Sequence, residues 1–274
     1  YASNPDMFRR LCGVPNYSAG AWPQAQGDGL ELATSVGGFL RGRDKYRSGF
    51  GSILSAENFP AKVTGRFITV PQNRLPWEIY VNVRGERFVR EDEPVQAVRE
   101  HSLLQQPDLR YWIVFDEAML REAPPGVAGW TREQIRASFD DHPMFARGDT
   151  LAELAQRAGI DAQGLARSVR DYNAALPAGI DPLGRQHRPR RIAEGPFYAI
   201  RHQGHSASSS VGVVVDRQLR VLQGGGAPVP NLYAAGEVLG SGATMGREFA
   251  AGMLLTPALT FGKLLGSTLP GCPS

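Results

Sequence analysis

The sequence predicts a two-part protein: an α+β unit, and then the closing part of a nucleotide-binding α/β fold. In the first part, segments that alternate apolar and polar residues are interleaved with helical patterns. The pattern then changes, because VGVVVD at 211–216 and NLYAAGE at 231–237 are typical of buried strands. The apolar run 252–265 predicts a helix that ends at Gly266. Residues 178–196, rich in Pro, Arg and Gly, mark the return from one part to the other.

Length and composition indicate a folded protein and exclude several classes. The 274 residues are 42% hydrophobic, which is enough for a substantial core and argues against disorder. The 30 basic and 27 acidic residues are spread along the chain and leave a net charge of only +3, so no nucleic-acid partner is predicted. The sequence begins at Tyr1 without a methionine or a signal-peptide pattern, and we therefore expect a piece of a longer polypeptide.

Neither a metal site nor a membrane span is predicted. Cys12 and Cys272 lie near opposite ends without ligand-like spacing, which predicts two free thiols. The longest apolar stretch, 253–265, contains Pro257 and Lys263, so it is too interrupted to cross a bilayer. We expect a soluble, cytoplasmic protein.

Three elements are predicted in the first half of the chain. Residues 27–40 place apolar side chains on one helical face, with Asp28 able to cap the first N–H groups. Residues 66–90 alternate around the Arg-Gly pair at 84–85, which predicts a β-hairpin. The aromatic and β-branched run RYWIVFD at 110–116 predicts a buried strand.

An αα-hairpin is predicted next. Thr150 and Glu153 form a capping box ahead of the first helix, and Gly159 ends it. Asp161 opens the second helix. The side chains expected on its buried face are Leu165, Val169 and Tyr172.

A glycine-rich stretch at 233–262 has the strongest chemical signal. It contains six glycines between a strand and a helix, a density that lets the backbone approach a flat ligand closely. The free N–H groups at the helix start favour negative charge. A buried anion or a polarised carbonyl would fit there.

This stretch resembles the closing motif of fumarate reductase-like flavoproteins, in which strand-AAGE is followed by a glycine-rich loop with one arginine and a helix ending in Phe-Gly. YVNVRGERFV at 80–89 resembles the family's V-N-x-x-G-x-R-F-V hairpin. The GDG at 27–29 resembles its helix entry, and PFYA at 196–199 is similar to its return from the capping domain. The chain thus resembles the C-terminal portion of fumarate reductase and succinate dehydrogenase flavoproteins, with ketosteroid and tricarballylate dehydrogenases among the relatives.

The resemblance implies FAD as cofactor and a division into domains. Residues 1–40 and 196–274 would belong to an α/β FAD-binding (Rossmann-like) domain, and 41–195 would form an α+β capping domain over the substrate. The sequence contains no G-x-G-x-x-G, so the N-terminal βαβ unit that holds the FAD pyrophosphate is expected to be missing from this chain.

Cofactor contacts are implied for two segments. Glu237 would hydrogen-bond a ribityl or ribose hydroxyl, and the backbone N–H groups from Gly252 onward would face the N1/O2 edge of the flavin. Such donors stabilise the anionic reduced flavin. The implied cofactor-binding residues are Gly236, Glu237, Gly252, Met253, Leu254 and Leu255.

Substrate contacts are implied for Arg247, Ser208 and His205. Arg247 stands where the family binds the substrate carboxylate, and its planar fork suits two-pronged carboxylate binding. Ser208 stands at the place of a substrate-contacting histidine, with His205 three residues earlier. Val95 stands at the place of the family's proton-donating arginine, so the resemblance does not identify the proton donor.

Three functions remain open. The first is hydride transfer between flavin N5 and a C–C bond of a small carboxylate, such as a polycarboxylate, with a possible electron-transfer partner. The second is a 3-ketosteroid-type dehydrogenase, which would need an apolar pocket in place of the Arg247 clamp. The third is a non-catalytic domain, because the pyrophosphate site is absent. For Glu91, in a Glu-Asp-Glu run, a solvated turn is favoured over a proton path.

Overall fold

The computed structural model describes residues 1–269, apart from the side chain of Ala178. The chain forms two compact units: unit 1 is Tyr1–Arg47 with Ser206–Ser274, and unit 2 is Ser48–His205. The predicted thiol Cys272 lies outside the described residues.

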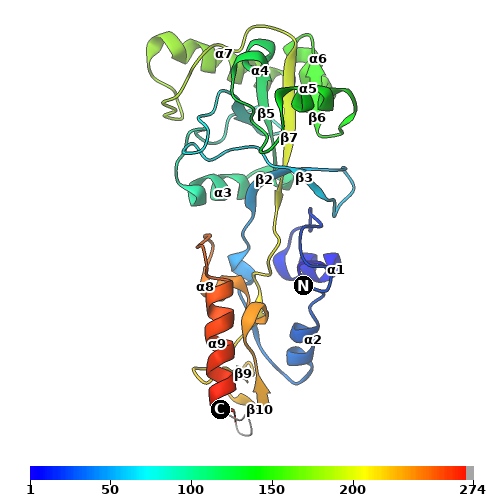
Figure 1. The fold of residues 1–274 in the computed structure, drawn as a ribbon, viewed down its shortest axis with the longest axis vertical. Helices are drawn as coiled ribbons and strands as arrows, with labels where there is room; N and C mark the ends of the chain where they lie inside the picture. Colours follow the sequence, from blue (N-terminus) through cyan, green and yellow to red (C-terminus); the bar gives the residue numbers. More distant parts are fainter. Residues whose placement is uncertain (270–274) are drawn as a thin grey trace. The chain divides into compact units, whose positions relative to one another are not determined.

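Unit 2 is built on an antiparallel sheet with the strand order β3-β2-β7-β5-β4, and β6 also pairs with β7 (Figure 1). The long strand β7 pairs with β2, β5 and β6, which places all of β7 in unit 2. The chain therefore passes between the units at 47–48 and 205–206, later than the implied boundaries at 40–41 and 195–196. The strands are β2 (Gly49–Leu54), β3 (Val63–Gly65), β4 (Ile79–Val81), β5 (Arg110–Asp116), β6 (Phe145–Gly148) and β7 (Phe197–His205).

Strand β5 confirms the prediction for 110–116. Six of its seven residues are buried, because it lies between β4 and β7 and has sheet neighbours on both sides. One face carries an aromatic stack in which the ring of Tyr111 lies 4.9 Å from Phe50 and 5.2 Å from His202. This stack forms part of the core of unit 2.

The predicted αα-hairpin is also confirmed. Thr150 accepts a hydrogen bond from the Glu153 N–H, but the Glu153 carboxylate accepts from Asp149 N–H, so half of the capping box forms. Gly159 ends the helix at φ 69°, and Asp161 caps the next one. The helices of unit 2 are α3 (Gln96–Leu104), α4 (Glu117–Glu122), α5 (Arg132–Asp141), α6 (Leu151–Ala158) and α7 (Ala162–Ala178), with the 3-10 turn η2 (Pro107–Leu109).

The predicted hairpin over 66–90 is wrong in its pairing. Strand β4 pairs along its length with β5, and the segment after the turn adds a single bridge between Val81 and Arg87. Gly85 takes φ 70°, so the turn itself is present. Residues 66–70 form no strand. Val81 pairs with Trp112 of β5 and with Arg87 at the same time, so the segment after the turn lies at the opposite edge of β4 from β5 and forms one bridge without becoming a strand.

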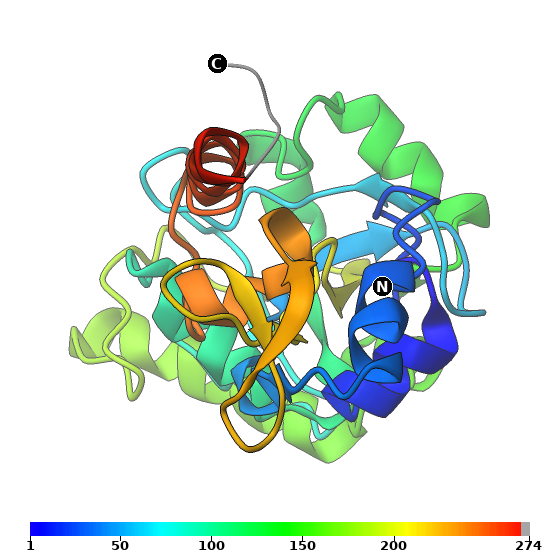
Figure 2. The same cartoon turned by 90° about the horizontal axis from the view of Figure 1, so that it is seen from below.

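Unit 1 packs helices α1 and α2 against short strands. Its core includes Phe8, Leu30, Val211 and Val221. The β9–β10 hairpin lies between α2 and α9 (Figure 2). The elements are α1 (Pro5–Cys12), α2 (Asp28–Ser35), β1 (Leu40–Arg41), η1 (Arg43–Lys45), β8 (Gly212–Val213), β9 (Arg220–Leu222), β10 (Pro228–Tyr233), η3 (Gly236–Leu239), α8 (Ser241–Thr244) and α9 (Leu255–Thr268).

The helix predictions in unit 1 need correction. The helix predicted at 27–40 ends at Ser35, and Gly27 takes the N-cap position without a side-chain bond, so Asp28 is the first helical residue and not the cap. The helix predicted at 252–265 is α9, which begins at Leu255 and continues through Gly266. None of the residues of α9 is buried in this chain.

The strand predictions in unit 1 hold only in part. The run 211–216 contributes two residues to β8, which pairs with β1, and β10 ends at Tyr233, before the rest of the predicted 231–237 strand. The chain leaves strand geometry at Gly236, where φ is 83° and η3 begins. The strand end and the 3-10 turn together place Gly236 and Glu237 of the AAGE segment in the wall of a cavity.

Candidate functional site

A cavity of about 310 Å³ opens in unit 1 beside η3, α8 and the start of α9. Its wall is formed by the segment before β8, by η3 and α8, and by the first turn of α9. Six residues predicted from the sequence line it: Ser208, Gly236, Glu237, Met253, Leu254 and Leu255. Residues not predicted for the site include Leu239, Ser241, Thr244 and Pro257, whose only sequence signal was their place in the glycine-rich stretch.

Backbone contacts between two distant segments hold this wall together. The N–H of Ser209 donates to the Glu237 carboxylate over 3.0 Å, and the N–H of Ser241 donates to the Ser209 carbonyl over 2.8 Å. Gly240 permits this approach, since it has φ 76° and a Cβ there would lie 2.4 Å from the Ser210 carbonyl oxygen. The structure thus explains one glycine of the loop and fixes one oxygen of Glu237.

The start of α9 brings backbone N–H groups that have no side-chain cap to the cavity. The N-cap residue Leu254 makes no side-chain cap, and Leu254 and Leu255 both line the cavity. The first N–H groups of a helix carry a partial positive charge. This wall therefore suits a ligand that holds or develops negative charge.

Arg247 and Gly252 do not line the cavity. Arg247 is exposed, and its Nε donates to the Asp44 carbonyl oxygen over 2.7 Å. Gly252 forms the turn before α9, with φ 81°, and its carbonyl accepts from the N–H of Thr256. Gly252 therefore lies in the turn that precedes the start of α9, and not in the cavity wall.

His205 and Ser208 belong to different units, although they are three residues apart. His205 is the last residue of β7 in unit 2, and its Nδ1 lies 3.1 Å from the Ser52 hydroxyl. Its ring lies over Gly49, where a Cβ would come within 2.7 Å of Cε1. Ser208 lines the cavity in unit 1. Val95, at the N-cap of α3, is half exposed and has no group that could donate a proton.

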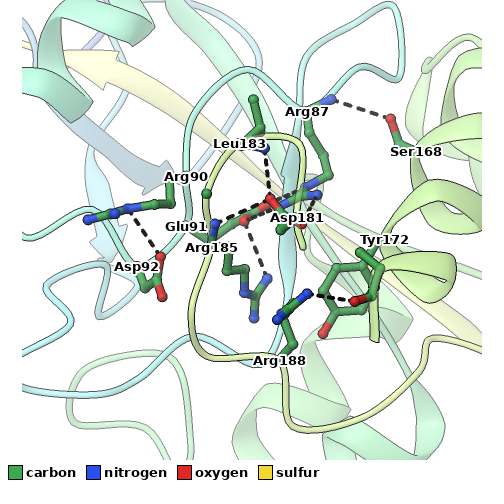
Figure 3. Close-up of polar contacts among 12 residues, drawn as sticks. Arg87, Arg90, Glu91, Asp92, Ser168, Tyr172, Asp181, Leu183, Arg185 and Arg188 are labelled. Atoms are coloured by element: carbon green, nitrogen blue, oxygen red, sulfur yellow. Dashed lines mark hydrogen bonds and ion pairs between the residues drawn. The ribbon is translucent and has the colours of Figure 1, made fainter. Parts of the chain in front are cut away.

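Glu91 lies in a buried ionic cluster of unit 2, so the predicted solvated turn is wrong (Figure 3). Its carboxylate is 2.6 Å from the Arg87 guanidinium and 3.4 Å from that of Arg185. Arg87 also pairs with Asp181 over 2.7 Å. Burial opposes ionisation of Asp181, but the paired Arg87 outweighs it and lowers the pKa of this carboxyl. The ring of Tyr172 lies close to the guanidinium groups of Arg87 and Arg185.

Residues 178–196, which were predicted to return from one part of the chain to the other, contain arginines that contact other residues of unit 2. Arg185 donates to the Glu78 carbonyl, Arg188 donates to that of Ala175, and Arg190 pairs with Glu122. These contacts bind the irregular segment to the sheet and helices of unit 2. Sequence reasoning missed this role because the partners are far away in the chain.

Comparison with known proteins identifies the family. A family model described as FAD binding domain matches residues 9–254, and the chain belongs to this family. FAD is the corresponding cofactor. The fumarate reductase (cytochrome) of Shewanella frigidimarina is 27% identical over 248 residues, covering 89% of this chain and 39% of the relative. The 4-oxocyclohex-2-ene-1-carboxylate 5-dehydrogenase of Sinomonas cyclohexanicum is 30% identical over 234 residues, covering 77% and 39%.

A solved structure agrees with the fold. The 3-ketosteroid delta1-dehydrogenase of Sterolibacterium denitrificans aligns with a TM-score of 0.72 at 24% identity, over 96% of this chain and 50% of that one. The family match and the curated relatives confirm the resemblance to fumarate reductase-like flavoproteins at the level of the family. The chain spans less than half of the two curated relatives. Between residues 1 and 269, no helix is both long enough and apolar enough to cross a bilayer.

The residues of the cavity fit a flavin. A flat ring system needs close backbone approach, which the glycine-rich wall allows. The reduced flavin carries negative charge near N1, which the start of α9 complements. Glu237 can accept a hydrogen bond from a hydroxyl on a ribityl chain or ribose.

Proposed function

We propose that the intact protein is an FAD-dependent oxidoreductase that transfers a hydride between flavin N5 and a C–C bond of a small carboxylate. The main support is the cavity beside α9, which unites Ser208, Glu237 and Leu255 with the backbone donors of a helix start. The names of both curated relatives describe reduction or dehydrogenation, and one of them acts on a carboxylate by name. In this proposal, unit 1 is part of the FAD-binding domain and unit 2 is the capping domain.

When bound, FAD supplies the atom that accepts or donates the hydride. Glu237 would hold a cofactor hydroxyl, and the N–H groups at Leu254 and Leu255 would stabilise negative charge on the pyrimidine edge. Arg247 would fix the substrate carboxylate, with its guanidinium oriented by the hydrogen bond from Nε to Asp44. The Ser208 hydroxyl and the His205 imidazole would provide polar contacts to the substrate.

The pyrophosphate of FAD would be held by a segment outside these 274 residues, since the sequence has no G-x-G-x-x-G. An electron-transfer partner would complete the cycle for a reductase. The isolated chain should then fold and purify without flavin colour. A stoichiometric flavin spectrum in the purified chain would show that the cofactor does not need such a segment.

A 3-ketosteroid-type dehydrogenase is the second candidate. It needs an apolar pocket in place of the Arg247 clamp, and Arg247 does not line the cavity. Among the described residues, the apolar side chains of the cavity wall include Leu239, Met253 and Leu254.

Anaerobic mixing of the intact flavoprotein with matched substrates separates these candidates. We expect the flavin absorbance to bleach with a saturated cyclic or linear carboxylate, or the reduced flavin to reoxidise with its unsaturated form. The corresponding carboxamide should react at least about tenfold more slowly, because it lacks the charge that Arg247 would bind. Bleaching by a 3-oxosteroid with no response to any carboxylate would favour the second candidate.

A further inference from the structure

The side chain of Ser241 lies in the cavity wall without a partner of its own. Ser241 is the first residue of α8, it lines the cavity, and only 8% of its surface is exposed. Its N–H donates to the Ser209 carbonyl over 2.8 Å, and its carbonyl accepts from the N–H of Met245 over 2.8 Å. Both backbone groups are therefore used inside the protein, and the hydroxyl is the polar group of Ser241 that remains for a ligand.

The Ser241 hydroxyl has no hydrogen-bond partner among the described residues. Two other buried serines of unit 1 differ from it in this respect. Ser206 donates from Oγ to the Ser208 carbonyl over 3.0 Å, and the Ser210 hydroxyl lies 3.7 Å from the Cys12 thiol. Because a buried hydroxyl without a partner destabilises a fold, one that is kept in the wall of a cavity indicates a partner supplied by the ligand.

The neighbouring groups of the wall indicate what kind of partner suits this hydroxyl. Thr244 also lines the cavity, but its Oγ1 already donates to the Ser241 carbonyl over 3.3 Å. The start of α9 favours negative charge in the same cavity. A hydroxyl beside such N–H groups is matched by an acceptor that gains negative charge. The carbonyl oxygens of a flavin are acceptors of this kind, since reduction places charge on the pyrimidine ring.

We propose that the Ser241 hydroxyl donates a hydrogen bond to a carbonyl oxygen of the flavin and stabilises the reduced cofactor. The inference rests on the part of the proposed function that places the flavin in this cavity, and it does not depend on the substrate. No proton is transferred. The hydrogen bond is stronger in the reduced state because the carbonyl oxygen then carries more charge. Ser241 therefore raises the reduction potential of the flavin.

Two measurements on the flavin of the intact protein test the inference in Ser241→Ala. Loss of a donor that favours the reduced form should lower the ratio of reduced to oxidised FAD affinity about tenfold. For a two-electron couple this corresponds to a reduction potential lower by about 30 mV, measured by equilibration with a reference dye. One C=O stretch of the oxidised flavin should also move to higher frequency in the infrared spectrum, and carbon-13 at C2 or C4 identifies the carbonyl.

Two further variants separate the hydrogen bond from a change in packing. Ser241→Cys keeps nearly the same side-chain volume, but a thiol is a weak donor, so it should behave like Ser241→Ala. Ser35→Ala is the matched control. It removes a hydroxyl of unit 1 that donates to the Leu32 carbonyl within α2 over 2.8 Å, and it should leave the potential and the C=O stretch unchanged.

The possible outcomes separate this inference from the proposed function. If the potential or the C=O stretch of Ser241→Ala stays at the wild-type value, the inference is overturned and the proposed function stands. Wild-type values in Ser241→Cys, or an equal shift in Ser35→Ala, would also overturn it, because packing would then explain the effect. If both shifts occur in a flavoprotein that reacts with no carboxylate, the inference holds and the proposed substrate is wrong.

Discussion

The free energy of unfolding should change with pH because of His202, which is fully buried in the sheet of unit 2. Its ring stacks on Tyr111 and meets the edge of Phe67. Nδ1 lies 3.0 Å from the Ile200 carbonyl oxygen and must carry the proton of that hydrogen bond, while Nε2 has no partner among the described residues. Protonation at Nε2 would create a buried cation among aromatic rings. Burial therefore lowers the pKa of His202 to about 4.

The direction of the effect follows from the two protonation states. Above pH ~6.5 the imidazole is neutral in both the folded and the unfolded chain, so His202 has no pH effect there. Between pH ~6.5 and ~4 only the unfolded chain binds the proton, and the folded state loses stability as the pH falls. The full difference is about 3 kcal/mol, and about 2 kcal/mol of it should be lost between pH ~7.5 and ~5.

Urea denaturation at these two pH values measures the effect through the tryptophans of unit 2. His202→Phe keeps a ring in the stack but cannot titrate, and it should reduce the loss of unfolding free energy between the two pH values by about 2 kcal/mol. If His202→Phe lost as much unfolding free energy between the two pH values as the wild type does, another group would be responsible and the reasoning would be refuted. The reporting tryptophans are Trp77, Trp112 and Trp130.

Four more outcomes are expected. In the intact enzyme, Arg247→Lys should lower kcat/KM roughly 10- to 150-fold with FAD retained, because one fork contact is lost, as steady-state kinetics and flavin content would show. Glu237→Ala should weaken FAD retention first, measured as flavin loss on dilution. Gly240→Ala should lower the unfolding free energy more than Gly246→Ala: both have positive φ, but only at Gly240 would a Cβ collide with backbone. Glu91→Gln should cost about 3–5 kcal/mol in urea titrations, since it breaks buried ion pairs; a cost near zero would contradict the cluster.

Some features depend on nearby residues, and the sequence alone was enough to predict them. The aromatic run of β5 predicts a buried strand wherever it pairs, and the caps at Thr150 and Asp161 act within a few residues of the helix they start. The same is true of the glycine-rich stretch, whose composition predicts close backbone approach. Six of the nine predicted site residues meet at one cavity, because the segment of Ser208 pairs through the backbone with the segment after Glu237 and the start of α9 completes the wall.

Other features depend on partners that are distant in sequence, and only the tertiary structure decided them. Glu91 lies in a charged run that is typical of solvated turns, but Arg87 and Arg185 compensate its charge, and the chain buries it. His205 and Ser208 are close in sequence, yet β7 pairing draws His205 into unit 2 and leaves Ser208 in unit 1. Local periodicity reports which face of an element is apolar. It carries no information on which distant strand or charge will meet that face, because those contacts depend on the free energy of the whole fold.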